Sequence, residues 1–246
     1  MHSYRTLPAA LAAVAAAVGC AAAPASASAP VSPPSGSGRT VAVSSPADAP
    51  GRAAVPAPVA VVASPGRPAA DKTDPRTETA LLAIPSIGLR DLRVVPYAGT
   101  TDDWAGTRIQ DRGVAASPYG RHGGVGPGEV GNYLVTAHRL SAGGPLRDLP
   151  ALAEGDLVLV TAGGRVHEYR ITDTRQTSFR SERSLAEQRA DVPGAPGRKP
   201  VKAMITISTC ATPEDDAAGN FWRDEKGNPE HRIDKIGELV SSRKAP

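Results

Sequence analysis

The sequence predicts an all-β fold, a closed or nearly closed β-barrel with a few short helices. Three observations support this prediction. Strand-like runs of apolar and β-branched residues begin near Leu81 and recur almost to the C-terminus. Glycine- and proline-rich turns separate these runs, and the 246 residues include 25 Gly and 24 Pro. Helical periodicity is scarce, and the combination is typical of barrels built from many short strands.

The expected strands follow one another along the chain. Residues 81–97, "LLAIPSIGLRDLRVVPY", read as two short strands around a turn. A strand is expected from Val130 to Ala137. Apolar alternation on both sides of residues 162–164, "AGG", predicts a hairpin. A buried strand is expected over Val201–Thr209, and a short final strand over Ile236–Val240. The segments "GPLRDLPAL" and "SERSLAEQRA" each predict one to three helical turns.

Residues 1–29 are typical of a signal peptide or a lipoprotein signal. A basic start leads into an apolar run over Ala9–Ala23, which is shorter than the roughly 20 residues that a membrane-spanning helix needs. Cys20 ends "AVGC", which resembles a bacterial lipobox with Ala where Leu is usual, so lipidation of Cys20 is one prediction. Cleavage after "ASA", at Ala25–Ala27, is the rival, and an uncleaved anchor is the third alternative.

Residues 30–79 are expected to be a disordered linker rich in Pro and Ala, and residues 80–246 a single folded domain. The stretch 21–79 holds 11 of the 24 prolines and no aromatic residue. Such a segment buries too little apolar surface to offset the entropy lost on ordering.

The charge distribution argues against nucleic-acid binding. The net charge is +3 and the pI about 9.0, but Lys and Arg are interspersed with acids rather than gathered in a basic stripe. Scattered His residues and a single usable Cys do not match the ligand spacing of a zinc site. Glu214, Asp215 and Asp216 are interpreted as a solvated loop, and His122 and His167 as surface residues.

Cys210 is the candidate reactive thiol. Exported proteins use cysteines mostly in disulfide pairs, and export processing would acylate or remove Cys20 and leave Cys210 without a partner in the chain. A cysteine nucleophile needs a nearby base or cation. His138, like Cys210, is expected at the C-terminal end of an apolar strand, where a sheet can fix a reactive group.

Several segments together resemble the sortase family. "TISTC", Thr206–Cys210, is similar to the family's TLXTC signature, with Ile where Leu is usual. "TAHR", Thr136–Arg139, resembles the sortase histidine segment, and "GGPLRDLPALAEGD", Gly143–Asp156, resembles the segment that follows it. The first strands, "IPSIGLRDLRVVPYAGT", also match in type and order. The resemblance covers about residues 80–243 and is greatest to actinobacterial class E-type sortases.

The resemblance implies the sortase-type closed eight-stranded barrel and a cysteine transpeptidase without cofactor or metal. Cys210 would attack an LPXTG- or LAXTG-like motif between Thr and Gly and form a thioacyl enzyme. His138 would protonate the leaving amine and deprotonate the incoming one, and Thr209 would line the substrate site. Arg232 is the preferred oxyanion arginine, although it lies 22 residues after the cysteine, and Arg223 is the alternative.

The resemblance also implies partners and a compartment. The substrates would be exported proteins with a C-terminal sorting motif. The acceptor would be an amine of peptidoglycan, of its lipid-linked precursor, or of another protein. The enzyme would act outside the cytoplasm, held to the outer face of the membrane by its N-terminal anchor or lipid, or secreted. A non-catalytic exported β-barrel binding module and a cysteine hydrolase are the competing hypotheses.

Overall fold

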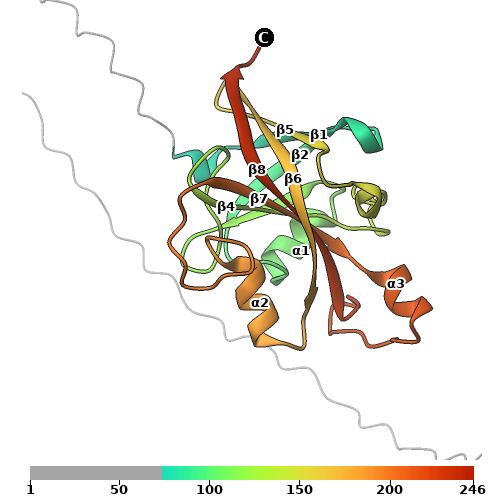
Figure 1. The fold of residues 1–246 in the computed structure, drawn as a ribbon. Helices are drawn as coiled ribbons and strands as arrows, with labels where there is room; N and C mark the ends of the chain where they lie inside the picture. The colour runs from blue at the N-terminus through green and yellow to red at the C-terminus, as the bar shows by residue number, and fades with distance from the viewer. Residues whose placement is uncertain (1–73) are drawn as a thin grey trace, which may run out of the picture. The chain divides into compact units, whose positions relative to one another are not determined.

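The computed structural model describes residues 74–246, and within them eight strands close into one barrel. Their order around the barrel is β1-β2-β3-β4-β7-β8-β6-β5 (Figure 1). The strands are β1 (Ala80–Ile84), β2 (Leu89–Ala98), β3 (Ala115–Tyr119), β4 (Gly131–Thr136), β5 (Leu157–Ala162), β6 (Arg165–Ser178), β7 (Ala203–Cys210) and β8 (His231–Lys244). The prediction of a closed eight-stranded barrel is confirmed.

Short helices lie between the strands. They are α1 (Trp104–Gln110), α2 (Glu182–Arg189) and α3 (Thr212–Ala217), with 3-10 turns η1 (Pro75–Thr77), η2 (Pro85–Ile87) and η3 (Leu149–Ala151). Polar side chains start two of the helices, because a side-chain oxygen can satisfy a free N–H of the first turn. Asp103 accepts from Gly106 N at 2.7 Å, and Ser181 accepts from Ser184 N at 3.2 Å. Figure 1 shows α2 and α3 beyond the end of the barrel that lies opposite the C-terminus.

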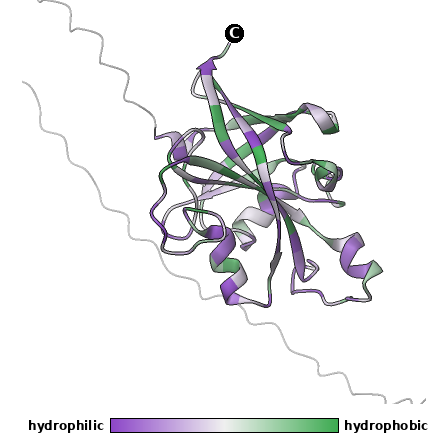
Figure 2. Ribbon diagram, in the orientation of Figure 1, coloured by the Kyte–Doolittle hydropathy of each residue, from purple (hydrophilic) through white to green (hydrophobic). Residues whose placement is uncertain are grey.

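Side-chain alternation places the core inside the barrel. In β5, Val158 and Val160 are fully buried, while Leu157, Leu159 and Thr161, which alternate with them, are partly exposed. The same interior holds Tyr169 of β6 and Ile205 and Ile207 of β7. Figure 2 shows apolar residues along the strands and mostly hydrophilic residues on α3. The barrel is therefore a rigid frame whose strand ends can hold polar groups in fixed places.

Two pairs of strands run parallel, and one of them shapes the site. β4 and β7 pair in parallel from Gly131 opposite Ala203 to Thr136 opposite Ser208. The carboxyl ends of both strands therefore meet at the same edge of the barrel. β8 is antiparallel to β7 and begins at this edge.

The expected strands are present, but the last one is longer than predicted. A strand over Ile236–Val240 is confirmed, but its predicted short length is wrong, because β8 spans 14 residues and pairs with β6 over its whole length. Backbone pairing with β6 extends regular structure into polar sequence that shows no apolar alternation. β3, α1 and α3 were not predicted, since each is short and of mixed composition.

The predicted signal sequence and most of the predicted linker lie outside the described residues. Described structure begins at Asp74, and Arg76 forms an ion pair with Glu129 at 3.5 Å. The first barrel strand begins at Ala80. In the described part of the chain, no helix combines the length and apolar character needed to cross a bilayer.

Candidate active site

Cys210 is the last residue of β7 and stands directly opposite Arg232 of β8. The alternation of an antiparallel pair puts residues that face each other on the same side of the sheet. The Cys210 thiol is partly buried, and its Sγ lies 4.0 Å from Asn228 Oδ1, which can accept a hydrogen bond from the S–H. The cysteine and the preferred arginine therefore start from neighbouring backbone positions.

His138 follows β4 by two residues and lies level with Cys210. The parallel register between Thr136 and Ser208 continues one step, because Ala137 N donates to Ser208 O at 3.3 Å. One further residue on each strand brings the chain to His138 and Cys210. The predicted histidine, cysteine and arginine thus lie at one edge of the barrel, just after β4, at the end of β7 and at the start of β8.

Cys210 and His138 line a common cavity of about 420 Å³. Trp104 and Thr107 of α1 form one wall, and the turn at 225–229 forms another. The two walls meet where the Lys226 ammonium lies 4.9 Å from the centre of the Trp104 ring, a cation–π contact. A second cavity of about 470 Å³, beside α2 and lined by Arg121 and His122, contains neither Cys210 nor His138.

Arg232 lies beneath this cavity rather than in its wall. Its side chain is buried, and its guanidinium stacks on Phe179 with 4.0 Å between the charge centre and the ring centre. Nη2 donates to Asp102 Oδ1 at 3.1 Å, and Nη1 donates to Pro229 O at 3.4 Å. Burial alone would lower the pKa of Arg232, but the Asp102 carboxylate and then Cys210 outweigh it and raise the pKa. The arginine is therefore a permanent cation held in one orientation.

Burial raises the pKa of the Cys210 thiol above its ordinary value. The Arg232 cation opposes this effect, while the carboxylates of Asp102 and Asp224 reinforce it. Since the ordinary value already lies above neutrality, the neutral thiol predominates at pH 7. A reaction at Cys210 must then dispose of the thiol proton.

Two charged contacts of the site were not predicted. Asp111, which follows α1, lies 2.9 Å from His138 Nε2 through Oδ1. Arg139 donates to Cys210 O at 3.3 Å and forms a two-point ion pair with Glu214 at 2.8 and 3.1 Å. Arg139 directly follows the histidine in the "TAHR" segment, so the sequence could have indicated that Arg139 lies near the site. Asp111 directly follows an unpredicted helix, and no sequence pattern indicated that it would lie near His138.

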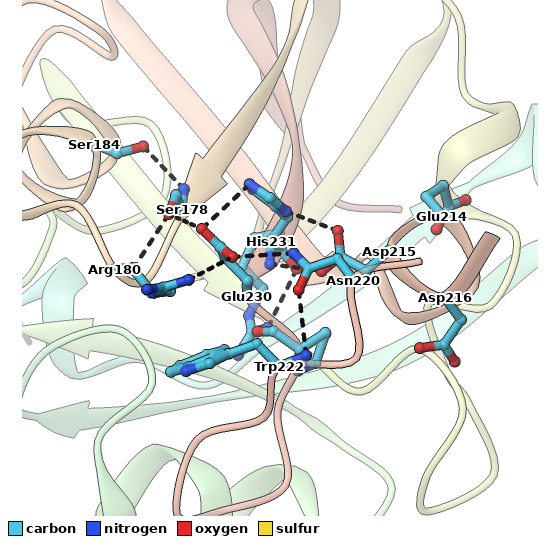
Figure 3. A network of polar contacts seen from close by, with 12 residues as sticks. Ser178, Arg180, Ser184, Glu214, Asp215, Asp216, Asn220, Trp222, Glu230 and His231 are labelled. Carbon is cyan, nitrogen blue, oxygen red and sulfur yellow. Dashed lines mark hydrogen bonds and ion pairs between the residues drawn. The ribbon is translucent and has the colours of Figure 1, made fainter. Parts of the chain in front are cut away.

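The acidic residues after Cys210 lie in helix α3, so the prediction of a loop is wrong, although the side chains of Glu214 and Asp216 stay 42% and 41% exposed. Each of the acidic residues binds a different basic side chain: Glu214 binds Arg139, Asp215 binds the His231 ring, and Asp216 binds Arg223. Figure 3 shows Asp215 and His231 turned toward each other. Asp215 Oδ1 lies 2.7 Å from His231 Nδ1, and Oδ2 accepts the backbone N–H of His231 at 3.0 Å.

Glu230 continues this network toward β6. Its carboxylate accepts from Ser178 Oγ and from Asn220 Nδ2, both at 3.0 Å, and lies 3.6 Å from Arg180 (Figure 3). Together with the Asp215–His231 pair, these bonds tie α3 and β6 to the start of β8. The backbone positions on either side of Cys210 and Arg232 are therefore fixed.

The other predicted residues lie as follows. Arg223 donates to Trp222 O at 2.7 Å and pairs with Asp216, away from the Cys210 cavity wall.

Thr209 is buried, and its hydroxyl donates to Ala137 O at 2.8 Å, which joins β7 to β4. A contact of Thr209 with substrate stays a prediction, and the structure gives its hydroxyl another partner. His122 is exposed as expected, but the interpretation of His167 as a surface residue is wrong, since His167 is buried within β6 and its Nδ1 lies 3.2 Å from Ser242 Oγ. Cys20 lies outside the described residues.

The fold and the site define a sortase-like β-barrel, with a cysteine, a histidine and an arginine on three neighbouring strands. The model of the sortase domain family matches residues 82–221, more than half of the chain. The chain therefore belongs to the sortase family, which is a family of transpeptidases. Among curated protein sequences, none matches this chain.

Solved structures show the same fold. The SrtA sortase from Actinomyces oris is 20% identical, with a TM-score of 0.51 over 68% of this chain and 82% of its own. Sortase E from Streptomyces avermitilis is 24% identical, with a TM-score of 0.49 over 69% of this chain and 91% of its own. Sortase E1 from Streptomyces coelicolor, solved with a tripeptide in the active site, is 23% identical, with a TM-score of 0.49 over 70% of this chain and 93% of its own. The likeness to the Actinomyces oris enzyme, at a TM-score of 0.51, supports the fold alone, and the class E-type assignment stays a prediction.

Proposed function

We propose that this chain is a sortase transpeptidase that cleaves an LPXTG- or LAXTG-like sorting motif between Thr and Gly. The observation that carries the proposal is the shared cavity of Cys210 and His138, with Arg232 opposite the cysteine. Cys210 attacks the Thr carbonyl and forms a thioacyl enzyme, because sulfur is an intrinsically strong nucleophile. His138 gives a proton to the leaving amine and later takes one from the acceptor amine.

Arg232 is proposed to stabilise the oxyanion of each tetrahedral intermediate. A guanidinium stays charged and presents several donors, so it can bind developing negative charge without being deprotonated. The backbone pairing of Arg232 with Cys210 supports this role. Arg223 is a weaker candidate, since its backbone pairs with Pro229 in an isolated bridge and not with Cys210.

The proposed substrates are exported proteins with a C-terminal sorting motif, and the acceptor is an amine of the cell wall, of its precursor, or of another protein. The enzyme is proposed to act outside the cytoplasm, retained at the outer face of the membrane by its N-terminal anchor or by a lipid on Cys20. Mass spectrometry of the mature N-terminus tests this attachment. A mature chain that begins after Ala27 overturns the lipid assignment.

The decisive experiment is a peptide panel with intact-mass detection. The full chain is incubated with LPXTG and LAXTG peptides, with and without a primary amine. The expected result is a mass increase on Cys210 equal to the N-terminal peptide fragment, followed by amine-dependent product. The Cys210→Ala variant should form neither. Cleavage by that variant contradicts the proposal, cleavage indifferent to amine indicates a hydrolase, and no turnover of any peptide favours a binding module.

A further inference from the structure

The end of α1 is packed against the loop that carries His138. Asp111 keeps helical backbone angles after α1, and its N–H donates to Thr107 O at 2.9 Å. Gly113 then turns the chain with φ +75°, and a Cβ at this position would lie 3.1 Å from Ala142 O. This close approach fixes the helix end beside the loop after β4. Asp111 is therefore placed next to His138 by packing, as well as by its charge.

The contact between Asp111 and His138 distinguishes the two nitrogens of the imidazole ring. Asp111 Oδ1 lies 2.9 Å from His138 Nε2. An ionised carboxylate can only accept a hydrogen bond, so Nε2 must carry a proton for this bond to exist. The hydrogen bond at one ring nitrogen sets which nitrogen is free to react. In neutral His138, Nδ1 is then the unprotonated nitrogen.

We propose that Asp111 is a positioning residue, which holds His138 through Nε2 and leaves Nδ1 as the nitrogen that moves protons in the reaction. This inference rests on the proposed function. Asp111 does not touch the reacting atoms in this role. It keeps the ring in one orientation and one tautomer, so that each turnover begins with a free lone pair at Nδ1.

The proton balance of both half-reactions passes through Nδ1. In acylation, the Sγ–C bond forms and the C–N bond to Gly breaks, and the thiol proton moves by way of Nδ1 to the departing amine. In transfer, the acceptor nitrogen forms the new amide bond as the S–C bond breaks, and one amine proton returns by way of Nδ1 to Sγ. No other reactant is needed. The raised pKa of the Cys210 thiol supports this scheme, because a neutral thiol brings the proton that the leaving amine requires.

Asp111 is not needed to hold the domain together. Its side chain is 58% exposed, whereas that of His138 is 12% exposed. Exposed ion pairs contribute about 0–1 kcal/mol to stability. Replacing the carboxylate should therefore leave the barrel folded, and an effect on catalysis can be separated from unfolding.

Nuclear magnetic resonance of the full chain labelled with 15N-histidine tests the tautomer directly. The His138 signals are assigned by comparison with His138→Gln. Neutral wild-type His138 should carry its proton on Nε2. In Asp111→Asn the fixed acceptor is lost, because the amide can also donate to Nε2, and the spectrum should show a mixed or reversed tautomer. An unchanged tautomer in Asp111→Asn overturns the proposal.

Steady-state kinetics with a sorting-motif peptide and an amine give the second readout. Asp111→Asn should lower kcat about 10-fold or more, with KM changed less than about two-fold, since general acid–base catalysis is lost while binding is kept. Asp111→Glu should restore part of kcat. Asp148→Asn is the control, because Asp148 is exposed and makes no side-chain cap bond. Wild-type kcat in Asp111→Asn contradicts the role.

The two experiments separate this inference from the proposed function. A wild-type chain that forms no thioacyl enzyme overturns the function, and the tautomer comparison still decides whether Asp111 directs the ring. A wild-type chain that is active, with an Asp111→Asn variant that is equally active, overturns the positioning role alone.

Discussion

Asp102 and Arg232 form a buried ion pair beneath the candidate active site. Asp102 Oδ1 lies 3.1 Å from Nη2 and 3.3 Å from Nε of Arg232, and the two side chains are 10% and 3% exposed. Asp102 has the uncommon backbone angle φ 64°, and its Oδ2 is buried without a hydrogen-bond partner among the described residues. A non-glycine residue with this angle persists where its surroundings compel it. The pairing with Arg232 supplies such a constraint.

Loss of the Asp102 carboxylate should destabilise the domain. Asp102→Ala leaves a buried guanidinium without its counter-ion, and removing one partner of a buried pair costs about 3–5 kcal/mol. Urea denaturation measures the change in the free energy of unfolding. Lys202→Ala is the matched control, because the Lys202–Glu238 pair is exposed and should contribute less than about 1 kcal/mol. Equal losses in the free energy of unfolding in the two variants would show that the buried pair contributes no more to stability than the exposed pair.

The identity of the oxyanion arginine can be tested with conservative variants. Arg232→Lys keeps a cation for Asp102 but loses the planar fork of donors, and it should lower kcat by about 10²–10³-fold. Arg223→Lys should leave kcat close to the wild-type value, since Arg223 belongs to the Asp216 pair. Peptide transfer rates are compared after circular dichroism has shown that both variants are folded. An inactive Arg223→Lys with an active Arg232→Lys reverses the assignment.

The reactivity of Cys210 should respond to its charged neighbours in opposite directions. Arg232 lowers the pKa of the thiol, so Arg232→Gln should raise it and slow alkylation by iodoacetamide at pH 8. Asp224 raises the pKa, so Asp224→Asn should lower it and accelerate alkylation. Rates measured from pH 6 to pH 10 give the apparent pKa of each variant. Arg223→Gln serves as the control with no expected shift, and a common shift in all three variants would refute the electrostatic explanation.

Buried His167 should make the domain less stable in mild acid. Burial, and then the Arg165 cation, lower its pKa from the ordinary value of 6.5. The unfolded chain therefore binds a proton more readily than the folded chain as the pH falls below 6.5, and folding loses stability there. The stabilising effect is complete above pH 6.5. In urea denaturation at pH 7.5 and 5.5, wild-type protein should lose more stability than His167→Gln. Identical losses would exclude His167 as a source of the pH dependence.

Much of the site could be predicted from the sequence because its parts lie at strand ends. Cys210 and His138 each close an apolar run, and such runs form buried strands whatever their partners are. The register of β4 and β7 then brings the two residues level, which the sequence does not encode in any local pattern. Arg232 was the preferred arginine because apolar residues follow it, and β8 does begin beside it.

The contacts that tune the site could not be predicted. Asp102 and Asp111 stand among turn-like and polar residues of "TDDWAGTRIQDRG", where acids are ordinarily solvated. They meet Arg232 and His138 across 130 and 27 residues of sequence. The acids after Cys210 are predicted to be a solvated loop for the same reason, although in α3 each of them contacts a basic side chain: Arg139, His231 or Arg223.

The sequence by itself determined the barrel class, most of the strands, and the candidate cysteine, histidine and arginine. It did so because strand formation and turn chemistry depend mainly on residues close together in the chain. The tertiary structure alone decided which carboxylates face Arg232 and His138, that Arg232 lies beneath the cavity, and that burial raises the pKa of the Cys210 thiol. Those properties depend on burial and on distances between charges, and both arise only when segments far apart in the sequence pack together.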